Sequence, residues 1–332
     1  MIDTIYIERE VAAHPRAQQI CARFPEAVQI ACDRYSEIFN RKAQNFRLQK
    51  RRPALILANK FDHYILEAPA DYGIGSEYNF YFSHMLNCLY DCRYCFLQGM
   101  FRSAHYVVFV NYEDFTDAIA KKMKQLPDKD VFFFSGYDCD SLALEPITGF
   151  VDHFLPFFRG LPNAWIELRT KSTQIRRLMA LEPVKNCVVA MSFTPAELAT
   201  ALEHKAPSVN RRIEAMAQLQ KRGWKLGVRF DPLIFHEDYK EQYRRLFDQV
   251  FEKINADSLH SASLGSFRLP RPFYRTMSRL YPDEKLFAAA SEDVNGMISY
   301  RKSLKEEIEA FCEEALLGYI PRQIYFPCRK AI

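Results

Sequence analysis

Short apolar runs alternate with segments of helical periodicity along most of the chain. The apolar runs have the length of buried strands, and they cover residues 78–83, 131–136, 165–170, 188–194, 226–233 and 259–267. Between them, apolar residues recur every three or four positions, which predicts helices at 111–123 (with Asn111 as its cap), 144–158, 173–180, 210–221 and 241–254. Buried strands that alternate with helices are typical of a parallel sheet with right-handed crossovers. Such units are too few here for a closed eightfold barrel, so the pattern predicts an α/β fold with an open, partial (β/α)6 barrel.

Both ends of the chain depart from this alternation. A strand-like run at 54–58 follows helical stretches near the N-terminus. Near the C-terminus, the Asn-Gly pair at 295–296 is typical of a type I′ hairpin turn, and a charged helix at 303–317 and a short strand at 323–326 follow it. The expected parts are therefore an N-terminal helical and strand extension (1–75), the barrel (76–268), and a C-terminal hairpin and helix segment that contacts substrate (269–332).

Composition narrows the class of protein without identifying it. The chain has 332 residues, 48% hydrophobic and 26% charged, which is enough apolar material for a large core. Its formal net charge of +4 permits a nucleic-acid partner without requiring one. Nine cysteines without a regular framework favour a reducing compartment, and the chain shows neither a signal peptide nor an apolar run of membrane-spanning length. We expect a cytoplasmic monomer without membrane contact.

Three cysteines in one short segment carry the strongest chemical signal. Cys88, Cys92 and Cys95 have the spacing C-x3-C-x2-C. Three thiolates from one loop can hold three irons of a [4Fe–4S] cluster, and the fourth iron then keeps an open position for a ligand. The loop follows the first predicted barrel strand, and catalytic groups of such barrels collect at the C-terminal ends of the strands.

Two simpler interpretations of these cysteines are weaker. A zinc site could add His84, four residues upstream, but structural zinc sites usually combine two separated ligand pairs, and this chain has no second pair. Buried structural thiols are common, but three within eight positions beside two tyrosines and an arginine are not a core pattern. The spacing therefore favours an iron–sulfur cluster.

An ordered series of motifs resembles the spore photoproduct lyase family, radical S-adenosylmethionine (SAM) enzymes that repair a thymine dimer linked through a methyl bridge. The similar segments are 95–98, 110–113, Thr170-Lys171, Ser192, 231–237, 268–272, 281–282 and the hairpin at 295–301. The resemblance extends from about residue 75 to the C-terminus and is weak before that. It implies that the barrel is a radical SAM barrel.

The resemblance also implies two cofactors, a [4Fe–4S] cluster and SAM. The cluster would bind SAM at its open iron, and one-electron reduction would release a 5′-deoxyadenosyl radical. The expected iron ligands are Cys88, Cys92 and Cys95, and the expected SAM contacts are Lys171, Ser192, Tyr94 and Asp140. Lys171 could instead form an ion pair with Glu145 or Asp140. The implied partners are DNA with a damaged thymine and a one-electron reductant such as flavodoxin or ferredoxin.

The sequence departs from the family pattern where the hydrogen-atom donor is expected. The family has tyrosines on both sides of its last cluster cysteine, whereas this chain keeps Tyr94 and has Phe96 as the second. Tyr137 occupies the position of the family's donor cysteine, and Cys139 lies two residues further on. Three alternatives remain: Cys139 is the donor, Tyr137 and Cys139 form a relay, or the final quench differs. The candidate catalytic residues are Cys139, Tyr137 and Tyr94.

Basic and aromatic residues near the C-terminus suggest contacts with DNA. The expected substrate or DNA contacts are His236, Tyr300, Arg301, Arg268 and Arg271, together with a basic patch at 41–52. Tyr300 would act as a wedge beside a displaced base. Such charges could also be an ordinary solvated surface. Two other functions stay open at this point: a radical SAM enzyme acting on another DNA or RNA lesion or modified nucleotide, and a non-catalytic zinc- or cluster-stabilised nucleic-acid-binding protein.

Overall fold

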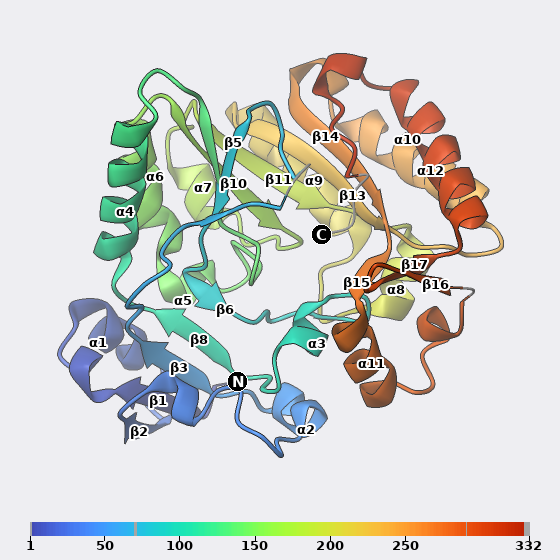
Figure 1. Cartoon of the computed structure of the whole chain (residues 1–332). Coiled ribbons are helices and arrows are strands. Elements are labelled where there is room, and N and C mark those ends of the chain that lie inside the picture. The colour runs from blue at the N-terminus through green and yellow to red at the C-terminus, as the bar shows by residue number, and fades with distance from the viewer. Residues whose placement is uncertain (1, 70–71, 290, 329–332) are drawn as a thin grey trace.

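A curled seven-stranded sheet forms the centre of the molecule (Figure 1). The computed structural model describes residues 2–69, 72–289 and 291–328. The parallel strands are β5 (Tyr78–Tyr81), β9 (Val131–Phe134), β10 (Ala164–Thr170), β11 (Cys187–Ser192), β13 (Lys225–Leu233) and β14 (Leu259–Ser266). The short strand β4 (Leu66–Glu67) pairs antiparallel with β5. The predicted strands and the partial barrel are confirmed.

Helices lie on the outside of this sheet, and apolar side chains from both layers fill the core between them (Figure 1). They are α4 (Tyr112–Gln125), α6 (Phe150–Arg159), α7 (Arg176–Ala180), α8 (Ala196–Leu202), α9 (Val209–Arg222) and α10 (Tyr239–Lys253). The prediction of a single helix at 144–158 is wrong, because α5 (Glu145–Thr148) and α6 are separate helices. Gly149 between them has a left-handed φ of 60°, which ends α5. Helix α8 was not predicted. Among the helices that the structure describes, none has the length and apolar character of a membrane span.

The N-terminal residues build a second sheet together with strands from the segment after β5. Its order is β2-β1-β3-β8-β6, with β1 (Thr4–Glu8), β2 (Val28–Cys32), β3 (Leu55–Ala58), β6 (Met85–Leu86) and β8 (Tyr106–Phe109). Helices α1 (Pro15–Ala22) and α2 (Phe46–Arg51) accompany it. Asn111 is the N-cap residue of α4, as expected, but its side chain makes no capping hydrogen bond. It binds the backbone N–H and C=O of Lys60 at 2.9 and 2.8 Å and so ties the ends of β8 and β3 together. The three-part division of the chain stays a prediction.

The C-terminal segment contains the expected hairpin and helix. Strands β16 (Ser291–Val294) and β17 (Met297–Tyr300) are antiparallel, β17 also pairs with β15 (Arg268–Pro270), and α11 (Arg271–Leu280) follows β15. Asn295 and Gly296 have φ values of 52° and 86°, as a type I′ turn requires. Helix α12 (Lys302–Leu317) matches the predicted helix. The strand expected at 323–326 is instead a 3-10 turn (Arg322–Ile324) and a single bridge between Tyr325 and Ala262 of β14.

The helix after the cysteine loop packs against the C-terminal segment at a glycine. A β-carbon on Gly99 of α3 (Leu97–Met100) would lie 2.7 Å from the Cα atom of Phe273 in α11. Because backbone atoms stand in the way, one of the two helices must move to accommodate a side chain.

We expect Gly99→Ala to lower the free energy of unfolding by roughly 1–3 kcal/mol, the usual range for overpacking. The matched control is Gly160→Ala after α6, where the nearest atom to an added β-carbon is 3.4 Å away. Urea denaturation of the three proteins measures the effect. Equal midpoints for Gly99→Ala and Gly160→Ala would contradict this packing.

Candidate functional site

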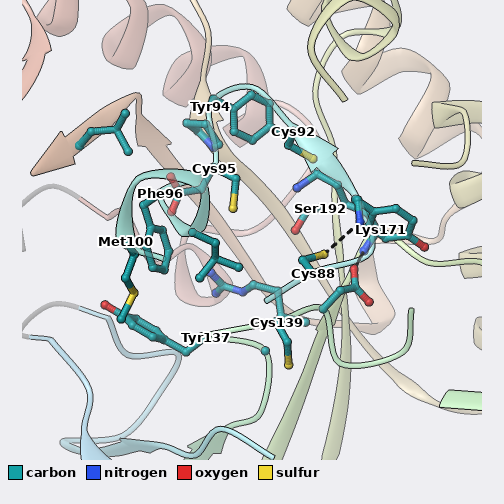
Figure 2. A pocket seen from close by; sticks show the side chains of 18 of the residues that line it. Cys88, Cys92, Tyr94, Cys95, Phe96, Met100, Tyr137, Cys139, Lys171 and Ser192 are labelled. Atoms are coloured by element: carbon teal, nitrogen blue, oxygen red, sulfur yellow. Dashed lines mark hydrogen bonds between the residues drawn. The ribbon is translucent and has the colours of Figure 1, made fainter. Parts of the chain in front are cut away.

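A cavity of about 420 Å³ lies where the barrel strands end at their carboxyl termini. The predicted site residues that line it are Cys88, Cys92, Tyr94, Cys95, Tyr137, Cys139, Asp140, Lys171, Ser192 and Arg268. They come from the cysteine loop and from the ends of β9, β10, β11 and β14, which lie far apart in the sequence. The structure thus brings the expected cofactor residues and donor residues to one cavity (Figure 2).

The cysteine loop is held in place from two sides. On one side, β7 (Asp91–Cys92) pairs antiparallel with β12 (Glu203–His204), and the Arg93 amide donates to the Leu202 carbonyl at 2.8 Å. On the other side, the Lys50 ammonium of α2 donates to the carbonyls of Cys88 and Tyr90 at 2.8 and 3.0 Å. Sequence reasoning assigned Lys50 to an exposed basic patch, whereas it is only 4% exposed. The loop geometry therefore depends on contacts from distant parts of the chain.

The positions of the three cysteines are compatible with a cluster. Their sulfur atoms surround a shared space, and the Tyr90 amide donates to the Cys88 sulfur at 3.4 Å (Figure 2). Within the described residues, no group of three His, Cys, Asp or Glu side chains is placed to hold a metal ion. In a [4Fe–4S] cluster each thiolate binds a different iron, so the sulfurs need not converge on one point. Burial raises the pKa of Cys88 to about 12, so iron has to displace the thiol protons.

His84 is a core residue and does not complete a zinc site. It is 1% exposed, its ring stacks on Phe150 with centroids 4.0 Å apart, and it is not part of the cavity lining. Burial lowers the pKa of His84 to about 3, so the ring is neutral. The zinc interpretation of the loop therefore loses its proposed fourth ligand.

Lys171 presents its ammonium to the cavity. Its side chain lies over the Tyr94 ring, with the Nζ atom 5.3 Å from the ring centroid. Burial acts to lower the pKa of Lys171, but the negative charges of Cys92 and Glu203 outweigh it and raise the pKa above its usual value. Asp140 and Glu145, the alternative ion-pair partners, accept backbone amide hydrogen bonds instead. A partly buried cation that faces the cavity suits an anionic ligand group.

Asp140 organises the strand ends around the cavity. One carboxylate oxygen accepts from the Thr170 hydroxyl at 2.6 Å and from the amides of Leu142 and Ala143, and the other accepts from the Lys171 amide at 2.7 Å. Its expected role as a SAM contact stays a prediction. These bonds also fix the backbone from which the Lys171 side chain projects.

A buried polar network lies behind the cysteine loop. The Tyr94 hydroxyl donates to Glu203 and lies 3.4 Å from the Thr194 hydroxyl, and Glu203 forms an ion pair with Arg212. Glu203 and Arg212 are 4% and 1% exposed. Arg212 also donates to the Ser192 carbonyl at 2.8 Å and so reaches the end of β11. The Tyr94 hydroxyl is thus engaged within the protein, and its catalytic role stays a prediction.

Sequence reasoning missed this network, although one signal was present. Arg212 occupies a position of α9 that the spacing of Val209, Ile213 and Met216 marks as the apolar face. A cation on such a face needs a buried acidic partner. Glu203, in contrast, carries no comparable local signal.

Tyr137 and Cys139 lie at the wall of the cavity after β9. The Tyr137 ring stacks on Tyr81 with centroids 4.3 Å apart and lies 5.6 Å from the Phe96 ring. The Cys139 thiol donates to the Ser135 carbonyl at 3.6 Å and packs against a core cluster that contains Leu144. Burial raises the pKa of Tyr137 to about 12 and that of Cys139 well above its usual value. Both groups therefore keep their hydrogen at neutral pH.

The expected DNA contacts lie on or next to the sheet of β15, β16 and β17, but they differ in exposure and in partners. Arg268 lines the cavity and pairs with Asp231 at 3.1 Å, so it is not part of an exposed surface. Arg271 pairs with Asp293 of the hairpin, Arg301 is exposed, and His236 is half-exposed and accepts from the Asp238 amide at 3.2 Å. The roles of these residues stay predictions.

Tyr300 is not a wedge at the hairpin tip, and that prediction is wrong for this conformation. The side chain is 2% exposed, and its hydroxyl accepts from the Phe235 amide at 2.9 Å. Tyr300 ends β17, and its ring packs against Phe267 with centroids 5.9 Å apart. The tip of the hairpin consists of Asn295 and Gly296.

Comparison with known proteins identifies the family. The fold is a partial α/β barrel with a cavity at the carboxyl ends of its strands. The family model described as spore photoproduct lyase matches residues 2–303. The chain belongs to the spore photoproduct lyase family.

Individual relatives are distant in sequence. The chain is 25% identical over 202 residues to a spore photoproduct lyase of Bacillus subtilis (strain 168), and 23% identical over 201 residues to one of Clostridium acetobutylicum. Each match spans 60% of this chain and only 59% of the relative's length. A solved spore photoproduct lyase mutant with bound AdoMet and dinucleoside spore photoproduct superposes with a TM-score of 0.86 at 16% identity, over 98% of each chain. A second solved structure, complexed with dinucleoside spore photoproduct, gives a TM-score of 0.84, also at 16% identity and over 98% of this chain and 99% of the other. At these identities the likeness establishes the fold.

We expect Glu203→Gln to lower the free energy of unfolding by roughly 3–5 kcal/mol at neutral pH, because it leaves the buried Arg212 without a counter-charge. Burial acts to raise the pKa of Glu203, but Lys171 and Arg212 lower it below 4.5 overall. The ionised carboxylate therefore contributes stability above its unfolded pKa, and this contribution disappears as the pH falls through the folded pKa. The difference in the free energy of unfolding between wild type and Glu203→Gln should therefore become smaller in acid.

Denaturation at several pH values measures this effect. The control is Glu197→Gln, which removes an exposed ion pair with Arg245 and should cost less than about 1 kcal/mol. A pH-independent difference for Glu203→Gln would show that packing, and not charge, is responsible.

Proposed function

We propose that this protein is a radical SAM lyase that repairs a thymine photolesion of the spore photoproduct type in DNA. The observation that carries the proposal is that one cavity contains the three cysteines, the Lys171 ammonium and the two hydrogen-bearing groups of Tyr137 and Cys139. Membership of the spore photoproduct lyase family supports it, as do solved relatives that hold AdoMet and the dinucleoside lesion.

The cofactors assigned to this cavity are a [4Fe–4S] cluster and SAM. Cys88, Cys92 and Cys95 would hold the cluster, and together with SAM it supplies a 5′-deoxyadenosyl radical after one-electron reduction. Lys171 is the cation that would bind the SAM carboxylate, and Ser192 at the end of β11 would contact SAM beside it. Asp140 and the network of Glu203 and Arg212 would keep these groups in position. A flavodoxin or a ferredoxin is a suitable electron donor.

The lesion would lie against the aromatic wall of the cavity. Phe96, Tyr81 and Tyr137 present rings on which a pyrimidine can stack. A base inside a duplex reaches such a pocket only after it has been flipped out of the stack. Exposed basic residues of α2, among them Arg47 and Arg51, would neutralise phosphates and make affinity salt-dependent.

We assign the returning hydrogen atom to Tyr137. Its ring forms part of the cavity's aromatic wall, whereas the Cys139 thiol is bonded to Ser135 and packs into the core. The phenol O–H bond of Tyr137 would break as a C–H bond forms on the product thymine radical, which leaves a tyrosyl radical. One hydrogen atom, which is a proton together with an electron, passes from Tyr137 to the thymine radical, so no separate proton is needed.

A second candidate function is favoured by the same residues. Tyr137 and Phe96 stand where the family has a cysteine and a tyrosine, which changes both the donor and the shape of the wall. A different DNA or RNA lesion or a modified nucleotide would then be the substrate. 5′-Deoxyadenosine formation without thymine repair would identify this case.

The first test is repair by the anaerobically reconstituted protein. With SAM, a reductant and a spore photoproduct dinucleotide, we expect 5′-deoxyadenosine and repaired thymines by mass spectrometry. Cys88→Ala should lose both products, because only two iron ligands remain. Cys21→Ala, in α1 and away from the cavity, should keep both. Reductive SAM cleavage by Cys88→Ala would refute the proposal.

The second test separates the two donor candidates. Tyr137→Phe removes only the hydroxyl, and we expect repaired thymine per 5′-deoxyadenosine to fall at least about tenfold, which corresponds to about 1.4 kcal/mol of barrier. Cys139→Ala should leave that ratio within about twofold. If Cys139→Ala instead abolishes repair and Tyr137→Phe does not, the thiol is the donor.

A further inference from the structure

Lys50 is a buried lysine that the proposed reaction does not yet use. It belongs to α2, outside the barrel, and is 4% exposed, while its neighbours Arg47 and Arg51 are exposed. Its ammonium donates to the backbone carbonyls of Cys88 and Tyr90 at 2.8 and 3.0 Å. A lysine is rarely buried without partners for its ammonium, because removing this charge from water is expensive.

The two hydrogen bonds of Lys50 fix the turn at the first cysteine of the loop. Both carbonyls belong to the segment in which the Tyr90 amide donates to the Cys88 sulfur. Amide hydrogen bonds to a ligating sulfur affect the electronic properties of a metal centre. Lys50 thereby orients a group that touches an expected iron ligand.

Lys50 is itself tied to the other support of the loop. The Lys205 ammonium donates to the Lys50 carbonyl at 2.7 Å. Lys205 directly follows β12, the strand that pairs with Cys92. Helix α2, the cysteine loop and β12 therefore form one connected unit. Among the contacts described here, Lys50 is the residue of this unit that places a cation beside Cys88.

We propose that Lys50 is a positioning residue that raises the reduction potential of a [4Fe–4S] cluster bound by Cys88, Cys92 and Cys95. This inference rests on the proposed function only for the presence of that cluster. One-electron reduction adds one negative charge at the loop, and a fixed cation in a low-dielectric site favours the more negative state. The electron comes from the one-electron donor of the proposed reaction, and the step transfers no proton.

Three variants distinguish charge from support. Lys50→Met removes the ammonium and keeps most of the length of the side chain. Lys205→Met removes the tether to the Lys50 carbonyl and keeps the Lys50 charge. Arg51→Met removes an exposed cation one residue further along and is the matched control. If Lys50→Met does not fold, as shown by circular dichroism, Lys50→Gln takes its place.

The measurement is a potentiometric titration of the reconstituted proteins, monitored by electron paramagnetic resonance, with iron and sulfide content determined in parallel. For Lys50→Met we expect the ratio of reduced to oxidised cluster at a fixed potential to fall about tenfold, which equals about 59 mV for a one-electron couple. Lys205→Met should lose its cluster faster in air with little change of potential, and Arg51→Met should match wild type. An unchanged potential in Lys50→Met would overturn the inference.

Failure of the proposed function would look different. If wild type takes up no iron and sulfide, the proposed cofactor is wrong. Hydrogen exchange of the apoprotein then tests the positioning role: faster exchange of residues 88–95 in Lys50→Met than in Arg51→Met supports it, and equal exchange overturns it.

Discussion

The cysteine loop keeps its shape because Glu203 holds it through both its backbone and its side chain. The Glu203 backbone pairs in register with Cys92, and its carboxylate binds the Tyr94 hydroxyl and the Arg212 guanidinium. A carboxylate that is 4% exposed would be strongly destabilising without such partners. Its ionised form in turn holds the Lys171 ammonium charged at the cavity. One residue thus links the position of the thiols to the electrostatics of the neighbouring ligand site.

A second buried carboxylate that is held by cations lies in the barrel interior. Glu167 of β10 is fully buried between Arg229 and Arg169, with ion-pair distances of 2.7 and 2.8 Å. Burial alone would raise the pKa of Glu167, but the two cations outweigh burial and lower the pKa to about 2. Such charges add little net stability compared with apolar packing. They do fix the relative positions of β10 and β13, whose ends carry Lys171 and Asp231. Charge pairing in the barrel therefore contributes to the geometry of the cavity.

The sequence predicted what depends on local pattern. The buried strands were found because their apolar runs are continuous, and the type I′ turn at Asn295 was found because few residues other than Asn and Gly adopt its dihedral angles. The pairing of β3 with β8 was not found, since the strands are about fifty residues apart and either could have joined another sheet. Lys50 and Glu203 escaped notice for the same reason: each acquires its partners only when distant segments meet. The burial of Tyr300 depends on which face of β17 meets the core, and a short strand next to a turn does not specify that face.

The surroundings of the proposed donor Tyr137 are consistent with its large side chain. A hydrogen-atom donor must carry its hydrogen at neutral pH, as an ordinary phenol or thiol does. Burial raises the pKa of both Tyr137 and Cys139 further in the same direction. A tyrosine is much larger than a cysteine, so its ring needs room beside the loop. Phe96 provides an apolar neighbour 5.6 Å away, and Tyr81 supplies a stacking partner at 4.3 Å. A second hydroxyl at position 96 would have to be solvated or bonded within this apolar wall. The proposed donor Tyr137 and its neighbour Phe96 are therefore physically coupled: the larger ring occupies the wall, and the residue beside it carries no polar group.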